Sequence, residues 1–372
     1  MKIAWIGIIV GLAFGGVACN SLEKNKSVSI LEDKNGNILT ICEFSKINPD
    51  GISIKLSEIT DSFKIVHFDN DVYFKFSSLS ISDNYIGIIQ ENGPFLLYNH
   101  SGDFLCTVGN IGTGPGEYAW RPYDAIIDEK GKKVYLASFA FSNKILVYDL
   151  EGNYLDEIET KHRLNKPKIF LDKHGGLSII HLPMETNNGS TILASYFDKE
   201  RIHQADYPAE TKFLVKDFNQ ELFADHNTSN FSFHNTICDT LYHYIADKNV
   251  IYPKFTIDFG ILDPKPIHIY NETSRFYIAN IFDKGTVFVD KEDHSAKYTR
   301  VVNDYCGHMK YPQYAFKNGW TFRMFEPHQL IKWINKRLSD TSCSTNDRTE
   351  LEKLLSSINE EGNNILFMGK LN

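Results

Sequence analysis

The chain has 372 residues, of which 42% are hydrophobic, a fraction that supports a sizeable core and excludes wholesale disorder. Its formal net charge is −8 and no long run of Lys or Arg appears, so the composition argues against nucleic acid as a partner. Aromatic residues make up 13% of the chain, and 26 Phe with 19 Tyr favour strands over helices.

The beginning of the sequence has the pattern of a leader. A basic start at Lys2 precedes residues 3–18, which carry no charge and are shorter than the roughly 20 residues that span a bilayer. Ala18 is followed by Cys19, and a lipoprotein leader places a cysteine there because its thiol takes up diacylglycerol. Gly16 departs from that pattern, which usually has Leu or another aliphatic residue at this position.

We therefore expect residues 1–18 to be a removable lipoprotein signal peptide, Cys19 to be acylated, and residues 19–27 to form a tether. The expected location is the cell envelope, as an outer membrane lipoprotein held by its lipid anchor, on the periplasmic or the surface side. Plain secretion and an uncleaved anchor are the alternatives.

The cysteines and histidines predict no metal site and no disulfide scaffold. Without Cys19 the number of cysteines is odd, and they lie far apart with no C-x-x-C: Cys42, Cys106, Cys238, Cys306 and Cys343. We expect most of them to fill the core as small apolar side chains. The thirteen histidines show no H-x-x-x-H or H-E-x-x-H spacing, so we expect neither a metal nor a cofactor.

A repeat of about 50 residues is the main indication of the fold. Residues 95–104 (FLLYNHSGDF) align with residues 145–154 (ILVYDLEGNY), and each segment follows another short apolar run. Runs that are apolar at nearly every position indicate strands covered on both faces. Weaker copies follow toward the C-terminus. Strands this short, with frequent turns, predict an all-β chain folded as a six-bladed β-propeller over residues 28–372.

Helices are expected only in one insertion, at about residues 326–360. Residues 327–338 are one candidate, and a stripe of Leu351, Leu354, Leu355 and Ile358 marks another. Ser344 with Asp347 resembles a capping box at the start of the second helix. Residues 364–371 then read as a last strand, which we expect to close the ring by pairing with an N-terminal strand.

Residues 108–118 (VGNIGTGPGEY) resemble the G-x-G-P-G-E-Y signature of six-bladed β-propeller lipoproteins of Gram-negative bacteria, whose blades are similar to NHL repeats. Residues 54–59, 239–242 and 257–260 resemble further parts of that family. The resemblance covers residues 52–372, and it departs where Asn363-Asn364 replaces a common Asn-Pro. It implies a fold and an envelope location, and it implies no catalytic residues.

The glycine-rich block is not a phosphate loop, because neither a Lys-Ser/Thr pair nor a helix follows it. A tight turn between blades, with positive φ at glycines, explains its composition. As candidate ligand-binding residues on a face of the ring we name Glu117, Tyr118, Trp120 and Arg121, which suit a sugar or a peptide terminus.

The predicted function is a lipid-anchored binding or scaffolding module for a glycan, a peptide or an envelope protein. One alternative is a hydrolase or lyase acting on glycans or peptides at the mouth of the channel, although no G-x-S-x-G motif supports it. Another is a structural subunit of an envelope complex. Converging ionisable groups would favour the enzyme, and an exposed apolar patch would favour the subunit.

Overall fold

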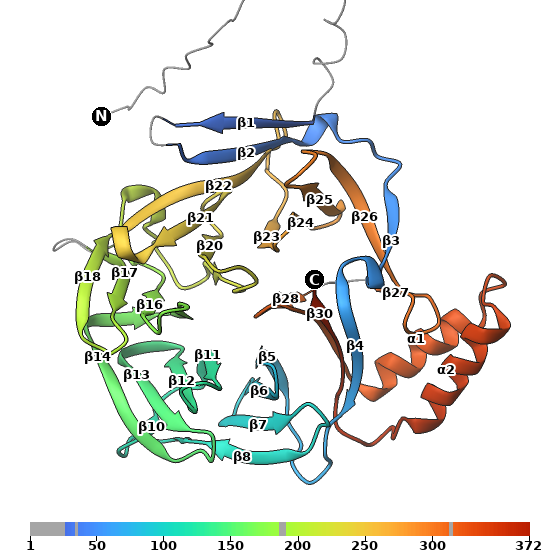
Figure 1. Ribbon diagram of the computed structural model, residues 1–372, viewed down its shortest axis with the longest axis horizontal. Coiled ribbons are helices and arrows are strands. Elements are labelled where there is room, and N and C mark those ends of the chain that lie inside the picture. The colour runs from blue at the N-terminus through green and yellow to red at the C-terminus, as the bar shows by residue number, and fades with distance from the viewer. Residues whose placement is uncertain (1–26, 34–35, 186–190, 312–314) are drawn as a thin grey trace, which may run out of the picture.

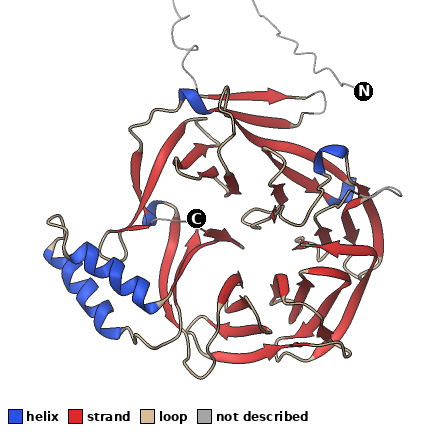
Figure 2. Cartoon of the chain, turned by 180° about the vertical axis from the view of Figure 1, so that it is seen from behind, coloured by secondary structure: helices blue, strands red, loops and turns tan. Residues whose placement is uncertain are grey.

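The computed structural model describes residues 27–33, 36–185, 191–311 and 315–372, so residues 1–18 and Cys19 lie outside the described part. The described residues form six sheets of four or more strands arranged in a ring, with two helices on its outer side (Figures 1 and 2). The prediction of an all-β, six-bladed propeller is therefore confirmed. Among the described residues, no helix is long and apolar enough to cross a membrane.

Each blade has four strands, which we give from the innermost to the outermost. Blade 1 has β5 (Phe76–Ile81), β6 (Tyr85–Gln90), β7 (Phe95–Asn99) and β8 (Phe104–Val108). Blade 2 has β11 (Pro122–Asp128), β12 (Lys133–Ser138), β13 (Ala140–Asp149) and β14 (Tyr154–Asn165). Blade 3 has β15 (Lys168–Leu171), β16 (Leu177–Ile180), β17 (Ile192–Phe197) and β18 (His203–Pro208).

The other half of the ring follows the same order. Blade 4 has β19 (Leu222–Phe223), β20 (Phe231–Asn235), β21 (Thr240–Ile245) and β22 (Val250–Asp258). Blade 5 has β23 (His268–Glu272), β24 (Phe276–Ile281), β25 (Gly285–Asp290) and β26 (Ala296–Asn303), and β27 (Met309–Tyr311) continues its sheet. Blade 6 has β28 (Ala315–Lys317), β29 (Trp320–Phe325), β30 (Ile365–Leu371) and β4 (Thr60–His67). A short parallel pair, β9 (Asn110–Ile111) and β10 (Glu117–Tyr118), lies between blades 1 and 2.

The uninterrupted apolar runs have a direct structural reason. Successive side chains of a strand point to opposite faces of its sheet, and in this ring both faces are covered. In β12, Val134 and Leu136 pack toward blade 1, whereas Tyr135 and Ala137 pack toward blade 3. Each central strand therefore contributes to two separate cores and is mostly apolar on both faces, although β20 also buries Ser232 and His234.

The repeat of about 50 residues also fixes the contact between successive blades. Gly102 lies in the turn between β7 and β8 with φ +93°, and its carbonyl accepts a hydrogen bond from Asp69 N (2.9 Å) just after β4. Gly152 occupies the same place in blade 2 with φ +88°, and its carbonyl faces Gly109 N at 3.4 Å. Both turns therefore need a residue that adopts positive φ and has no side chain to collide with the neighbouring backbone.

Blade 6 joins the two ends of the described chain. β4 pairs antiparallel with β30, from the Thr60–Leu371 pair to the His67–Ile365 pair. The expected closure by an N-terminal strand is thus confirmed, and it is β4 that provides it. The preceding strands extend other blades: β2 (Ile38–Glu43) pairs parallel with β22 and carries β1 (Val28–Glu32), and β3 (Ile52–Lys55) pairs parallel with β26.

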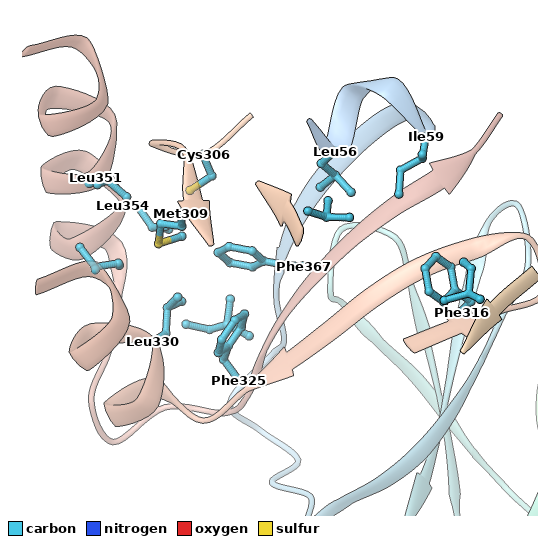
Figure 3. Close-up of a cluster of buried hydrophobic side chains, with 14 of the residues drawn as sticks. Leu56, Ile59, Cys306, Met309, Phe316, Phe325, Leu330, Leu351, Leu354 and Phe367 are labelled. Atoms are coloured by element: carbon cyan, nitrogen blue, oxygen red, sulfur yellow. The ribbon is translucent and has the colours of Figure 1, made fainter. Parts of the chain in front are cut away.

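The helical insertion lies between β29 and β30, as expected. Helices α1 (Pro327–Leu338) and α2 (Thr345–Ser357) pack Leu330 and Leu351 against Phe325 and Phe367 of blade 6 (Figure 3). Ser344 caps α2 by accepting a hydrogen bond from the Asp347 amide (3.1 Å), as the sequence pattern predicts. The helices therefore pack on the outside of the ring, against blade 6 and against β27 of the blade 5 sheet, and they do not line the channel cavity.

Gly102→Ala tests the contact between blades 6 and 1. A methyl group at Gly102 would lie 2.1 Å from the His67 carbonyl oxygen, whereas at Gly260 (φ +61°) it would meet nothing within 4 Å. Gly260→Ala should cost about 1–2 kcal/mol of unfolding free energy from backbone strain alone, and Gly102→Ala about 3 kcal/mol or more. Urea unfolding of both variants measures this difference, and equal costs would contradict the proposed packing.

Candidate functional site

A cavity of about 460 Å³ lies at the centre of the ring. Every blade contributes its innermost strand to the wall, and the contributing residues are Phe76, Ser77 and Ser78 (β5), Tyr123 (β11), Lys168 (β15), Leu222 and Phe223 (β19), Ile269 and Asn271 (β23), and Ala315, Phe316 and Lys317 (β28). Most of these residues stand at the beginning of their strands. The cavity therefore opens on the face crossed by the segments that lead from one blade to the next, which we call the linker face.

The opposite end of the channel is narrowed by two turns that meet across it. The residues after β19 contact the turn between β28 and β29: Asn318 N donates to the Asp225 carbonyl (2.8 Å). Gly319 N donates to Asn227 Oδ1 (3.0 Å). Blades 4 and 6 are not neighbours in the ring, so these bonds link opposite parts of the wall, and we call this end of the cavity its floor.

A buried ion pair crosses the same region. Lys317 Nζ of blade 6 donates to Asp124 Oδ1 of blade 2 at 2.6 Å, and both side chains are almost fully buried. Asp124 Oδ2 also accepts from Ile169 N (3.0 Å) and lies 3.7 Å from His226 Nε2. Burial alone would raise the pKa of Asp124, but the ammonium groups of Lys317 and Lys168 outweigh it and hold the pKa well below its usual range.

Glu221 is the second carboxylate at the wall, and it is also occupied. Its two oxygens accept hydrogen bonds from Lys166 Nζ and from the Tyr123 hydroxyl. Lys166 Nζ also donates to the carbonyls of Phe218 (2.7 Å) and Gln220 (2.8 Å). This network ties β11, β14 and the segment before β19 together, and it leaves Glu221 little capacity for a ligand.

Lys168 and Arg121 are the cationic groups that remain available. Lys168 Nζ lies 4.3 Å from the centre of the Tyr123 ring, and within the described residues no carboxylate comes within 4 Å of it. Burial lowers the pKa of Lys168, and the charge of Asp124 partly restores it. Arg121 donates to Ser77 Oγ (2.9 Å) and lies over the Phe139 ring, which leaves most of its five N–H donors free.

The floor of the cavity also holds a carboxyl group with an unusual pKa. Burial raises the pKa of Asp225 to about 7, even though Lys317 and Lys168 act in the opposite direction. Burial lowers the pKa of His226, so this imidazole is neutral at pH 7. With Asp225 partly protonated, the channel carries a net positive charge in a chain whose formal charge is −8.

The structure separates the four residues that the sequence suggested for ligand binding. Arg121 lines the cavity, but Glu117, Tyr118 and Trp120 lie outside its wall. Tyr118 is buried, and its hydroxyl donates to the Val108 carbonyl (3.0 Å) and accepts from Phe95 N (2.9 Å). Trp120 is half exposed on the linker face.

The glycine-rich block forms a turn, as expected, but Gly112 and Gly114 do not have the positive φ that the sequence suggested. Only Gly116 of its glycines after residue 110 has a positive φ, +70°. Glu117 folds back into the loop and accepts a hydrogen bond from Gly114 N (2.8 Å). A Cβ at Gly112 would lie 2.0 Å from the Glu117 carboxylate, so a side chain at this position would displace Glu117 from its place in the loop.

Sequence reasoning did not identify Lys168, Asp225, Lys317 or Asp124. These residues are separated by 44 to 193 positions, and each is an isolated charge near an apolar strand. The one usable signal was a lysine directly before an apolar run, as at Lys168 (KIFL). No spacing in the sequence shows that such positions meet in the channel.

Outside the channel, other candidate sites have less support. A cavity of about 500 Å³ lies beside the start of α1, lined by Lys75, Glu91, Glu326 and His328 among others, but it involves only blades 1 and 6 and the insertion.

Within the described ranges, no cluster of three or more His, Cys, Asp or Glu could hold a metal ion. The five described cysteines are free thiols, and Cys42 and Cys306 are buried in the core.

Comparisons with known proteins bear on the fold and the family. A family model described as "Domain of unknown function (DUF4934)" matches residues 39–370. A presumed exported protein of Bacteroides fragilis superposes with a TM-score of 0.58 at 15% identity, covering 86% of this chain and 97% of that one. The extracellular domain of a presumed one-component system of Bacteroides thetaiotaomicron has a TM-score of 0.41 at 13% identity, covering 71% of this chain and 32% of that one. A comparison with curated proteins gave no match.

Lys317→Met tests the ion pair at the floor. The substitution leaves the Asp124 carboxylate buried without its ammonium partner, and the unfolding free energy at pH 7 should fall by about 3–5 kcal/mol. The double variant Asp124→Asn/Lys317→Met removes the charge but keeps the acceptor for Ile169 N, and should recover most of the loss. Chemical denaturation measures both. If the double variant were no more stable than Lys317→Met, charge burial would not be the cause.

Proposed function

The chain belongs to the DUF4934 family, and we propose that it is a lipid-anchored binding module of the cell envelope that takes a carboxylate-bearing glycan or peptide in its central channel. One observation carries the proposal. Six blades contribute to a single cavity in which Lys168 has no carboxylate partner among the described residues.

The chemistry of the wall favours an acidic ligand. Asp124 and Glu221 are already paired with Lys317 and Lys166, so they do not cancel the charge of Lys168. The Lys168 ammonium group and the Arg121 guanidinium both line the cavity and can donate charge-assisted hydrogen bonds to a carboxylate. Asn271 and the serines of β5 add neutral partners for hydroxyl or amide groups. A cavity of this volume accommodates a sugar unit or the terminal residues of a peptide.

The envelope location is supported by the leader. Residues 3–18 and the Ala18-Cys19 junction have the composition of a lipoprotein signal, and an acylated Cys19 carrying two or more chains would anchor the protein stably. The Bacteroides fragilis protein that shares the fold is described as an exported protein, which agrees with this location. We also propose that the blades are NHL-like, because the repeats combine apolar central strands with a glycine of positive φ in the turn that follows.

A second candidate function, catalysis on the same ligand, is favoured by Asp225. A carboxyl group whose pKa is raised to about 7 suits general acid–base chemistry, and it stands beside Lys168 and Tyr123 in the cavity. A hydrolase or lyase would use Asp225 for proton transfer while Lys168 holds the substrate carboxylate. Appearance of a cleaved product during a binding experiment would identify this function.

Lys168→Met tests the binding site. Calorimetric titration with galacturonate and with a short peptide bearing a free C-terminus should show binding, and galactose and the amidated peptide should bind much more weakly. The variant should lose about tenfold to a hundredfold in affinity, because it removes a charge-assisted hydrogen bond worth about 1.5–3 kcal/mol. Lys199→Met, at an exposed lysine of the same blade, is the matched control and should bind normally. Equal affinity for charged and neutral probes would contradict the proposal.

The pH dependence of binding tests Asp225. Because its pKa is raised to about 7, Asp225 is neutral below that pH and gains a negative charge above it. Affinity for a carboxylate ligand should therefore fall as the pH rises from 6 to 8, and the same raised pKa makes the folded state less stable as the pH rises from about 4 to 7. Asp225→Asn should remove the fall in affinity. A fall that persists in this variant would assign it to another group.

A further inference from the structure

One region of the linker face exposes large apolar side chains. Ile261 is fully exposed, and the exposed fractions of Ile267, Phe282 and Leu262 are 71%, 53% and 39%. Three of these residues belong to the segment between β22 and β23, and Phe282 follows β24. The backbone joins them, because Phe282 N donates to the Ile267 carbonyl (2.9 Å). We call this set of four residues the apolar corner.

The apolar corner lies where the described chain begins. Glu43 N donates to the Ser27 carbonyl (2.7 Å), and Glu43 is paired with Asp258 at the end of β22. Gly260, which leads into the corner, donates from its amide to Asp258 Oδ1 (2.8 Å). Ser27 therefore lies two strand spacings, about 10 Å, from Asp258, which is three residues before Ile261.

We propose that the apolar corner inserts into the surface of a lipid bilayer, a proposal that rests on the lipid anchoring proposed above. The uncharged stretch of residues 3–18 and Cys19 precede Ser27 in the sequence. The eight steps along the chain from Cys19 to Ser27 span at most about 29 Å when the backbone is fully extended. An acyl group on Cys19 thus keeps the corner within reach of the membrane at all times.

Insertion is driven by apolar contact rather than by charge. Asp263, Lys265, Asp283 and Lys284 lie beside the corner, and their formal charges cancel. Lys265 is also paired with Asp239. The corner therefore suits a zwitterionic surface, where binding follows the apolar area that leaves water.

Contact at the corner also orients the ring. The corner stands on the linker face, over blades 4 and 5, and the channel cavity opens on the same face. Docking therefore turns the mouth of the cavity toward the bilayer. Ligands then reach the cavity from the aqueous layer at the membrane surface.

The test uses the mature chain, residues 19–372, with Cys19→Ser so that no acyl chain is present. The protein is sedimented with vesicles of phosphatidylcholine and phosphatidylethanolamine. We expect binding that the double variant Ile261→Ser/Phe282→Ser reduces at least tenfold. Ile202→Ser is the matched control, because Ile202 is 61% exposed in the turn between β17 and β18 and should not affect binding. Unchanged urea midpoints show that the variants are folded.

Two results would overturn the proposal. One is a chain that does not sediment with vesicles, or that sediments equally in all variants. The other is a dimer in solution that only the double variant dissociates, because the corner would then bind a second copy of the chain. Mass analysis of the native N-terminus and the titrations of the channel test the proposed function separately, since neither result depends on vesicle binding by the Cys19→Ser chain.

Discussion

The pairing of β4 with β30 is the interaction on which the rest of the structure depends. It joins residues that lie about 300 positions apart and supplies blade 6 with its outermost strand. Without β4, the edge of β30 would be exposed, and the apolar faces of blades 6 and 1 would lose part of their cover. β4 completes the four strands of blade 6, so this one antiparallel pair joins the two ends of the described chain and closes the ring of six blades.

The channel follows from the same geometry. Six blades that pack face to face hold their innermost strands at fixed positions around an axis, and the first residues of those strands face a common space. The backbone there is held by the cores behind it, so the charged side chains are positioned by a rigid scaffold. The strands β1, β2 and β3 add to the outer sides of blades 4 and 5 and leave the channel unchanged.

The fold could be predicted because its signals are local and repeated. The pattern of Gly102 and Gly152, the apolar runs of β6 and β12, and the cap at Ser344 each lie within a few residues of the structure they produce. The number of blades follows from repeat length and chain length. The positions of β2 and β3 could not be predicted, because a strand that pairs in parallel with the outermost strand of a blade has no periodic sequence pattern.

The site was only partly predictable, because it consists of single residues brought together across the ring. Arg121 lies three residues beyond the glycine-rich motif of residues 108–118 and was named together with it. Glu117 and Tyr118, which belong to the motif, serve the turn and the core. The motif thus marked a structural turn, and Arg121 reaches the channel because it ends the linker to β11.

The charges inside the channel are difficult to explain as structural elements alone. A buried ion pair such as Lys317 with Asp124 gains little over apolar residues of the same size, because desolvation offsets most of the attraction. The cores between blades 1, 2 and 3 are filled mainly with Ile, Leu, Val and aromatic side chains. The channel instead brings together Asp124, Lys168, Asp225 and Lys317, and a smaller buried group, Glu272 with His243 and Lys291, lies between blades 4 and 5. Departures from local packing rules concentrate at sites that are kept for function, and the larger of these groups supports the proposed site at the centre of the ring.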